Sequence, residues 1–189
     1  RSFVEAELLE LVTASPLRIE PSCPVFGACG GCDWQFLSYA EQLATKGTIF
    51  TDTLSRIGKV PREVILPVSP SPECYGYRSR VQLKVSRHKG ALRLGFFRTG
   101  SHDIVDFGAG CPLAHELLNR MADEFRSLLS RLPRGEAVQQ LDLAMGDDGE
   151  GIAILHCREA RPEQVAEELA AARDLIPSVS GAYVKGGAK

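Results

Sequence analysis

Three cysteines close together in the chain have the spacing of metal ligands. Cys23, Cys29 and Cys32 form the pattern C-x5-C-G-G-C. The paired glycines let the backbone bend around a bulky inorganic group and leave amide N–H groups free to point at sulfur. Three thiolates need a fourth ligand to complete a site. The sequence therefore predicts a metal site in this loop, closed by a cysteine from elsewhere in the chain.

Cys74 and Cys111 are the two candidates for the fourth ligand. Cys111 is followed by Pro112, which suits a first helical position, so we expect Cys111 at a helix N-terminus, where the dipole favours a thiolate. A Cys-Pro pair also closes the bacterial ferredoxin pattern. We therefore expect Cys111 rather than Cys74 as the ligand. Cys157 lies in an apolar run and is expected to be a small buried side chain.

The group held by four thiolates could be a structural zinc ion or an iron–sulfur cluster. Zinc sites usually have about two to four residues between their first two ligands. The gap between Cys23 and Cys29 is wider than this. The spacing therefore favours an iron–sulfur cluster, with a zinc-stabilised module as the alternative.

Positive charge is concentrated in one segment of a chain whose formal net charge is −2. Between residues 76 and 98 there are seven lysines or arginines and no acid, whereas acids outnumber bases ten to three between residues 136 and 174. A local basic face on a mildly acidic protein is typical of a selective nucleic-acid binder. It is also compatible with a solvated strand face.

The bulk composition indicates a globular protein. Of the 189 residues, 44% are apolar and 24% are charged, which is enough to build a core. No apolar run approaches the roughly 20 residues that a membrane span needs, and the N-terminus lacks the layout of a signal peptide. We expect a cytoplasmic monomer without a membrane contact, in which clustered cysteines bind metal rather than form disulfides.

The periodicity of the apolar residues predicts an α+β fold in which an antiparallel β-sheet has flanking helices and follows the cysteine-rich loop. Ser38 and Glu41 form a capping box that begins a helix ending near Gly58. The remaining predicted elements are strands at 3–12, 77–87, 92–97 and 101–107, a helix after Pro112, a hairpin at 140–145 and 152–157, a helix at 162–174 and a strand at 178–185.

The strand predicted at 77–87 would carry a cationic ladder. Val81, Leu83 and Val85 face one way, so the polar side chains between them face the other. With the arginine that follows the hairpin, they give our candidates for contacts with nucleic-acid phosphates or base edges: Arg78, Arg80, Gln82, Lys84 and Arg98.

The segment IVDFGAGC offers a second possible cofactor site. Asp106, Gly108 and Gly110 imitate the opening of a Rossmann domain that binds S-adenosylmethionine. The third glycine of that pattern is missing, and Pro112 removes an N–H donor at the expected helix start. We therefore assign no catalytic or cofactor-binding residue in this segment.

Three segments together resemble the iron–sulfur-containing branch of the RNA (uracil-5-)-methyltransferases. They are CPVFGACGGCDWQFLSYAEQLATK, YGYRSRVQLKV and LGFFRTGSHDIVDFGAGCPL, and the resemblance extends from about residue 15 to the end. The most specific part is C-G-G-C followed by Trp34, Gln35, Tyr39, Gln42, Leu43 and Lys46. Many relatives have Gln-His after the cysteines, whereas here Phe36 follows Gln35.

This resemblance implies that Cys23, Cys29, Cys32 and Cys111 bind a 4Fe-4S cluster and that the sheet domain helps hold rRNA or tRNA. In the family, a cysteine adds to uracil C6 and S-adenosylmethionine supplies the methyl group to C5. We assign no residue of this chain to those steps, because the Rossmann domain that carries them is expected to be absent. This fragment alone is therefore predicted to be inactive.

The expected domains follow from the same resemblance. They are residues 1–14 as a remnant strand of a TRAM-like β-barrel, 15–37 as the cluster loop, and 38–185 as an RNA-binding α+β domain closed onto the cluster through Cys111. Two other functions remain as alternatives, a zinc-stabilised nucleic-acid-binding module and a small iron–sulfur electron carrier.

Overall fold

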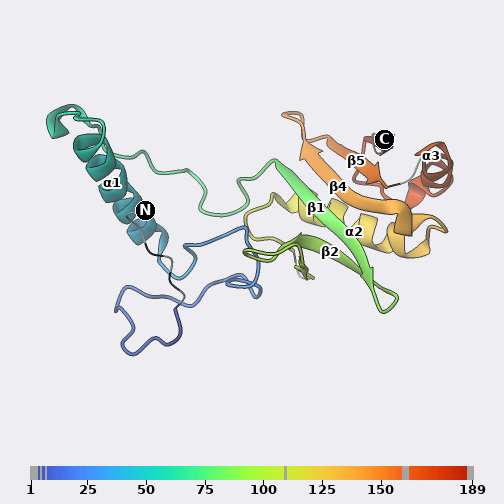
Figure 1. Ribbon diagram of the computed structural model, residues 1–189. Coiled ribbons are helices and arrows are strands. Elements are labelled where there is room, and N and C mark those ends of the chain that lie inside the picture. The colour runs from blue at the N-terminus through green and yellow to red at the C-terminus, as the bar shows by residue number, and fades with distance from the viewer. Residues whose placement is uncertain (1–3, 5, 7, 109, 159–161, 187–189) are drawn as a thin grey trace. The chain divides into compact units, whose positions relative to one another are not determined.

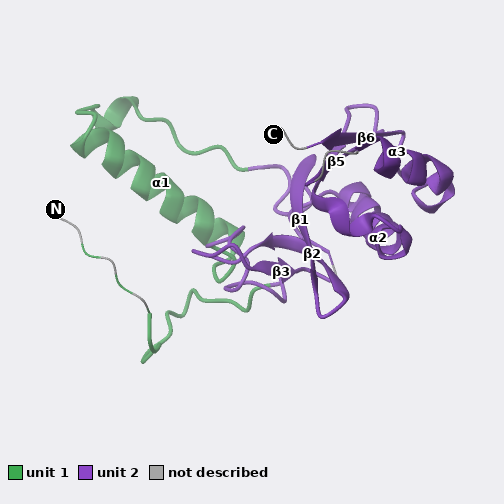
Figure 2. Cartoon of the chain, turned by 45° about the vertical axis from the view of Figure 1, so that its right-hand side comes forward, with its two compact units in different colours: residues 1–21, 34–70 green, residues 22–33, 71–189 purple. Residues whose placement is uncertain are grey.

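The computed structural model describes residues 4, 6, 8–108, 110–158 and 162–186. The chain divides into two compact units (Figure 2). Unit 1 contains residues 1–21 and 34–70, and unit 2 contains residues 22–33 and 71–189. This division differs from the expected domains, because the cysteine segment belongs with the sheet and the helix after Ser38 does not.

Unit 1 is built around the helix α1 (Tyr39–Arg56), whose N-terminal cap was predicted. The Ser38 hydroxyl accepts a hydrogen bond from the Glu41 amide at 3.3 Å, which satisfies one of the free donors at the helix start. From the first turn of the helix, the Gln42 side chain donates a hydrogen bond back to the carbonyl of Leu37, which precedes the helix, at 3.0 Å. A 3₁₀ turn, η1 (Arg62–Val64), follows later in the unit.

Some of the residues that gave the resemblance its specificity make structural contacts in unit 1. The ammonium group of Lys46 lies 5.7 Å from the centre of the Trp34 ring, and the Arg18 guanidinium lies 4.8 Å from that of Phe36. Both are cation–π distances. Together with the Gln42 bond, these contacts fix how the chain enters α1.

The strand predicted at residues 3–12 is wrong for the part of it that the structure describes. Val4, Ala6 and residues 8–12 are exposed and form no strand, and the other positions of the segment lie outside the described residues. The alternation of apolar and acidic residues cannot by itself form a strand, because a strand also needs a partner to accept its backbone hydrogen bonds.

Unit 2 contains one six-stranded sheet with the strand order β3-β2-β1-β4-β5-β6. Its strands are β1 (Arg80–His88), β2 (Ala91–Phe97), β3 (Ile104–Asp106), β4 (Val138–Met145), β5 (Gly151–Cys157) and β6 (Gly181–Gly186). The helices of this unit are α2 (Glu116–Arg131) and α3 (Pro162–Ala171), with the 3₁₀ turns η2 (Gly135–Ala137) and η3 (Arg173–Leu175) (Figure 1).

The predicted α+β fold is confirmed, with one difference in the sheet. The pairs from β3 to β5 are antiparallel, as expected, but β6 runs parallel to β5. A parallel neighbour needs a crossover connection, and α3 supplies it. The alternation within 178–185 identified the strand but carries no information on the direction of its partner.

The hairpin between β1 and β2 turns on Lys89 and Gly90, whose φ angles are +50° and +82°. Two successive positive φ angles match the right-handed twist of the flanking strands. The turn sets the register Val85↔Leu94. It therefore decides that the apolar side chains of both strands share one face.

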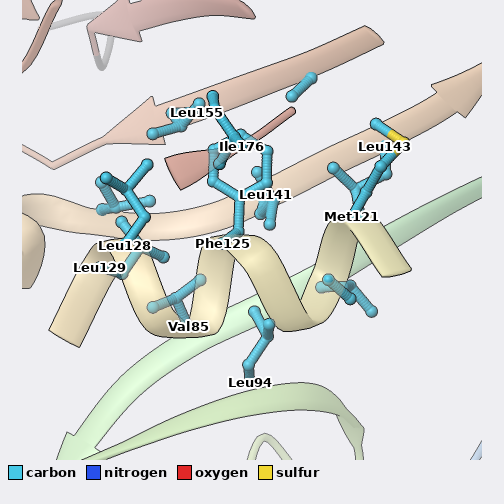
Figure 3. Close-up of a cluster of buried hydrophobic side chains, with 14 of the residues drawn as sticks. Val85, Leu94, Met121, Phe125, Leu128, Leu129, Leu141, Leu143, Leu155 and Ile176 are labelled. Carbon is cyan, nitrogen blue, oxygen red and sulfur yellow. The ribbon is translucent and has the colours of Figure 1, made fainter. Parts of the chain in front are cut away.

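The core lies between α2 and that face of the sheet (Figure 3). Phe125 is fully buried near the middle of the helix, among Leu141 and Leu155 of the sheet and Ile176. Burying one such side chain stabilises the fold by about 1.5–3 kcal/mol. The predicted apolar stripe of α2 is confirmed as core, and its fully or almost fully buried members are Leu118, Met121, Phe125, Leu128 and Leu129.

The structure corrects the start of α2. The helix begins at Glu116, and the Nδ1 atom of its N-cap residue His115 accepts a hydrogen bond from Leu117 at 3.2 Å. Pro112 is therefore in a turn and Cys111 is not at a helix N-terminus. The helix cannot start earlier, because the backbone of residues 112–115 is hydrogen-bonded to Gly76 and Arg78.

Candidate functional site

The cysteine loop of residues 22–33 is attached to the end of β2 by backbone hydrogen bonds. The Gly30 amide donates to the Phe97 carbonyl at 2.9 Å, and the Thr99 amide donates to Ala28 at 3.4 Å. A Cβ atom at Gly30 would lie 3.1 Å from the Phe97 oxygen, so any larger residue would push this backbone contact apart by a few tenths of an ångström. Gly31, the second glycine of the CGGC motif, instead donates an amide hydrogen bond to the Cys29 sulfur.

The pKa of the Cys29 thiol depends on the other three predicted ligands. Burial is the main cause that raises the pKa of the Cys29 thiol. The Gly31 amide lowers that pKa through a hydrogen bond, and the negative charges of Cys32, Cys111 and Cys23 raise it again. Each of these three thiols is thus close enough to act electrostatically on Cys29. Within the described residues, no group of three or more His, Cys, Asp or Glu side chains has the geometry of a metal-ion site.

The other two cysteines differ in their surroundings. Cys74 is exposed, and the hydroxyl of its neighbour Tyr75 accepts a hydrogen bond from Ser22 at 3.0 Å, whereas Cys157 is buried at the end of β5. Burial alone raises the pKa of Cys157, as expected for a thiol in apolar surroundings. The choice of Cys111 over Cys74 as the fourth ligand stays a prediction, and the helix-dipole argument for it was wrong, because Cys111 is not at a helix N-terminus.

A residue that the sequence did not indicate holds Cys111 in place. The Asn119 side chain accepts a hydrogen bond from the Cys111 amide at 2.8 Å and donates to the Cys111 carbonyl at 3.1 Å and to Ala114 at 3.3 Å. Gly110 adopts a φ of +93°, and a Cβ atom there would lie 3.1 Å from the Asn119 oxygen. Asn119 thus closes the turn that carries Cys111 against α2.

The candidate RNA ligands fall into two groups in the structure. Arg80, Gln82 and Lys84 project from the sheet face opposite the core, because they alternate with buried residues on β1. Arg98 lies beside the cysteine loop through a backbone bridge to Cys29, and Arg78 pairs with Ala114. The two groups therefore occupy the sheet face and the rim of the cysteine site.

Some of these polar side chains already have partners within the sheet. Lys84 donates to Gln140 and its ammonium group lies 5.2 Å from the centre of the Phe97 ring. Gln82 donates weakly to Asp142 at 3.5 Å. Arg80 is exposed, whereas Lys84 is half-buried, so Arg80 is the more accessible of the two cations.

The segment that imitated a cofactor site has a structural role instead. Strand β3 is a three-residue edge strand in an antiparallel pair, and no helix follows it directly. The Asp106 carboxylate accepts two hydrogen bonds from Arg126 on α2, at 2.7 and 2.8 Å, and one each from the amides of Leu94 and Gly108. The structure therefore contradicts the Rossmann alternative.

Comparison of the sequence with curated proteins identifies relatives of this chain. A 23S rRNA (uracil(1939)-C(5))-methyltransferase of Acidithiobacillus ferrooxidans is 38% identical over 160 residues, which are 84% of this chain and 36% of that protein. An uncharacterized RNA methyltransferase of Thermosynechococcus vestitus is 35% identical over 133 residues, 70% of this chain and 29% of that protein. This chain is related to RNA methyltransferases.

The relationship to RNA methyltransferases extends to the fold. The chain shares its fold with part of the tRNA (uracil-54, C5)-methyltransferase of Pyrococcus abyssi, solved in complex with S-adenosyl-L-homocysteine. The TM-score is 0.59 and the identity 23%, over 84% of this chain and 37% of that one. No family model matches the chain.

The chain spans about a third of the length of the RNA methyltransferases that it matches in sequence. The shared region includes most of the residues described above, since it covers up to 84% of this chain. No helix that the structure describes is both long and apolar enough to cross a membrane.

Proposed function

We propose that this chain is the RNA-binding and cluster-bearing part of a cytoplasmic, S-adenosylmethionine-dependent RNA (uracil-5-)-methyltransferase that acts on rRNA or tRNA. The observation that carries the proposal is the sequence relationship, at 38% identity over 84% of the chain, to a protein named as an rRNA uracil-C5 methyltransferase. Because the chain spans only part of that relative, methyl transfer is proposed for the whole protein, in which S-adenosylmethionine supplies the methyl group.

The exposed polar face of β1 supports the RNA-binding role. A uracil must leave its stack before an enzyme can reach its ring, so the RNA around it has to be gripped. Arg80 and Gln82 project from the sheet next to Lys84, and Arg78 and Arg98 lie at the rim of the cysteine loop. Cationic side chains in both places can bind phosphates on either side of an extruded nucleotide.

The chemistry of the four thiols supports a 4Fe-4S cluster as the resident group. Cys23, Cys29, Cys32 and Cys111 provide four soft sulfur ligands, which is the donor set of such a cluster. The Gly31 amide already favours the thiolate form of Cys29 through a hydrogen bond. The bound cluster would supply a rigid tie between the loop of residues 22–33 and the turn at Cys111.

The RNA-binding role is tested by removing the three arginine and lysine charges together. A variant with Arg78, Arg80 and Lys84 replaced by alanine should bind a uridine-containing stem-loop RNA more weakly. It should also show a flatter dependence of log K on log salt, by about 0.7 for each lost phosphate contact to single-stranded RNA. Fluorescence anisotropy at several salt concentrations measures both quantities.

Arg131→Ala is the matched control, because Arg131 is an exposed arginine at the end of α2. It removes one charge from the helix layer and should leave the slope unchanged. Equal affinities for the triple variant, the control and the unmodified chain would refute the proposed RNA face.

A further inference from the structure

The face of the sheet opposite α2 carries three rows of side chains that cross four strands. Residues paired between neighbouring strands project from the same face. In the middle row, Gln82 pairs with Asp142, Asp142 with Ile154, and Ile154 with Tyr183. The middle row thus places an aromatic ring on β6, on the same face as the polar ladder of β1.

The two flanking rows complete this face. One contains Arg80, Ala144, Ile152 and Gly181, and the other contains Lys84, Gln140, His156 and Lys185. Both rows begin with a cation on β1, and the second also ends with one on β6. The first and middle rows place Ile152, Ile154 and Tyr183 on β5 and β6, whereas the polar Gln140 and His156 lie between the two cations of the second row.

The ring of Tyr183 lies along the strand over Gly181. A Cβ atom at Gly181 would be 3.5 Å from the ring carbon Cε2 and 3.7 Å from the Tyr183 hydroxyl. Since glycine has no side chain there, the ring can lie over the backbone rather than stand away from it. Tyr183 nevertheless remains 62% exposed, and Ile152 beside Gly181 is 40% exposed. The result is an exposed aromatic surface with aliphatic neighbours.

The charges around this ring favour an anionic partner. Asp142 is the single acid in the three rows, and it is 93% buried, with hydrogen bonds from Gln140 at 2.7 Å and a contact with His156 at 3.0 Å. Burial opposes the charged form of this carboxylate, yet these bonds hold the pKa of Asp142 below its usual range. The Asp142 carboxylate is thus paired with side chains of the sheet, whereas Arg80 and Lys185 are exposed.

We propose that this face is a stacking platform for unpaired RNA, in which a base stacks on Tyr183 and the neighbouring phosphates contact Arg80 and Lys185. This inference rests on the proposed RNA-binding function. Every base has a flat π-face, so an exposed ring flanked by cations suits a single strand of any sequence. A paired helix does not suit it, because stacked bases do not offer their faces. The platform therefore selects the unpaired nucleotides that flank a target uridine.

The test compares Tyr183→Ala with Tyr183→Phe in the full 189-residue chain, using a fluorescently labelled oligouridylate of about ten nucleotides. Tyr183→Ala should weaken binding roughly 5- to 150-fold without changing the salt slope, because stacking involves no counterion release. Tyr183→Phe keeps the ring and should bind like the unmodified chain. Leu175→Ala, which truncates an exposed side chain on η3, is the control.

The possible outcomes separate this inference from the function on which it rests. If the unmodified chain binds RNA and Tyr183→Ala binds equally well, the platform is refuted and the proposed function stands. An equal loss of binding in Tyr183→Phe would show that the hydroxyl, not the ring, is recognised, and would also refute stacking. If the unmodified chain binds no RNA, the proposed function fails and the platform fails with it.

Discussion

At the scale of single residues, the site depends on a polar side chain that no motif predicted. Asn119 lies on α2, a helix that the sequence indicated only through its apolar residues. Its contact with Cys111 depends on a turn that brings the two residues together. Its amide provides one acceptor and two donors, and all three are used by backbone groups of Cys111 and Ala114. The side chain therefore positions the backbone of Cys111, a proposed ligand of the cluster.

Asn119→Asp should weaken retention of the cluster. The substituted carboxylate is similar in size but cannot donate to the carbonyl oxygens of Cys111 and Ala114, and its charge is repelled by them. We expect a loss of about 1–3 kcal/mol in the stability of the turn and a faster release of iron. The measurement is iron content and the decay of visible absorbance during incubation with a chelator.

Arg120→Ala is the control for this variant, because Arg120 is the next residue of α2 and pairs with Glu116 instead. Circular dichroism distinguishes loss of the cluster from loss of the fold. If Asn119→Asp releases iron at the same rate as the control, the turn does not need this side chain.

At the scale of secondary-structure elements, the edge strand β3 is attached to α2 by one ion pair. Arg126 makes two hydrogen bonds to Asp106, and both side chains are less than a third exposed. Burial of Asp106 opposes its charged form, but the hydrogen bonds from Arg126, Gly108 and Leu94 outweigh burial and lower the pKa of Asp106. A three-residue strand has few other contacts to hold it.

Asp106→Asn should destabilise unit 2 by about 1–2 kcal/mol at neutral pH, since a charge-assisted pair is lost at a partly exposed site. The pKa of Asp106 is lower in the folded state than in the unfolded state, so its contribution is complete above about pH 4 and disappears as the pH falls through the folded pKa. Urea denaturation between acidic and neutral pH measures this difference. A difference that stayed constant through the acid range would contradict the assignment.

The elements themselves were largely predictable. Each of the two hairpins, α1, α2 and α3 was expected from local periodicity and capping, because the alternation of Val81, Leu83 and Val85 and the spacing of Phe125 and Leu128 are set by backbone geometry. The start of α2 was not predictable, since it depends on hydrogen bonds from residues 112–115 to Gly76 and Arg78. A local pattern contains no information about such a partner.

At the scale of the whole molecule, the proposed cluster would join segments that are about eighty residues apart in the chain. The loop of residues 22–33 and the turn at Cys111 both belong to unit 2. A covalent tie that closes a loop of this length removes unfolded-chain entropy worth about 4.5 kcal/mol in the chain-entropy model. We therefore expect the proposed cluster to stabilise unit 2 and not only to occupy it.

Cys111→Ser should lower the iron content of anaerobically purified protein from about four per chain and lower the midpoint of thermal unfolding. Chelation of the metal from the unmodified chain should have the same effect on unfolding. Cys74→Ser is the matched control, because Cys74 is exposed and is the cysteine that we did not select as the fourth ligand. Metal analysis and calorimetry measure both effects, and a chain that holds one zinc ion and no iron would refute the cluster.

The sequence by itself determined which residues could do chemistry and which elements could form. Cys23, Cys29 and Cys32 were recognisable from their spacing, and the polar ladder of β1 from its alternation, because both patterns are local. The tertiary structure decided that β6 runs parallel to β5 and so places Tyr183 on the face of that ladder. It also decided that Asn119 holds Cys111. These contacts join residues from distant parts of the chain, and only the packing of α2 and α3 against one face of the sheet brings them together.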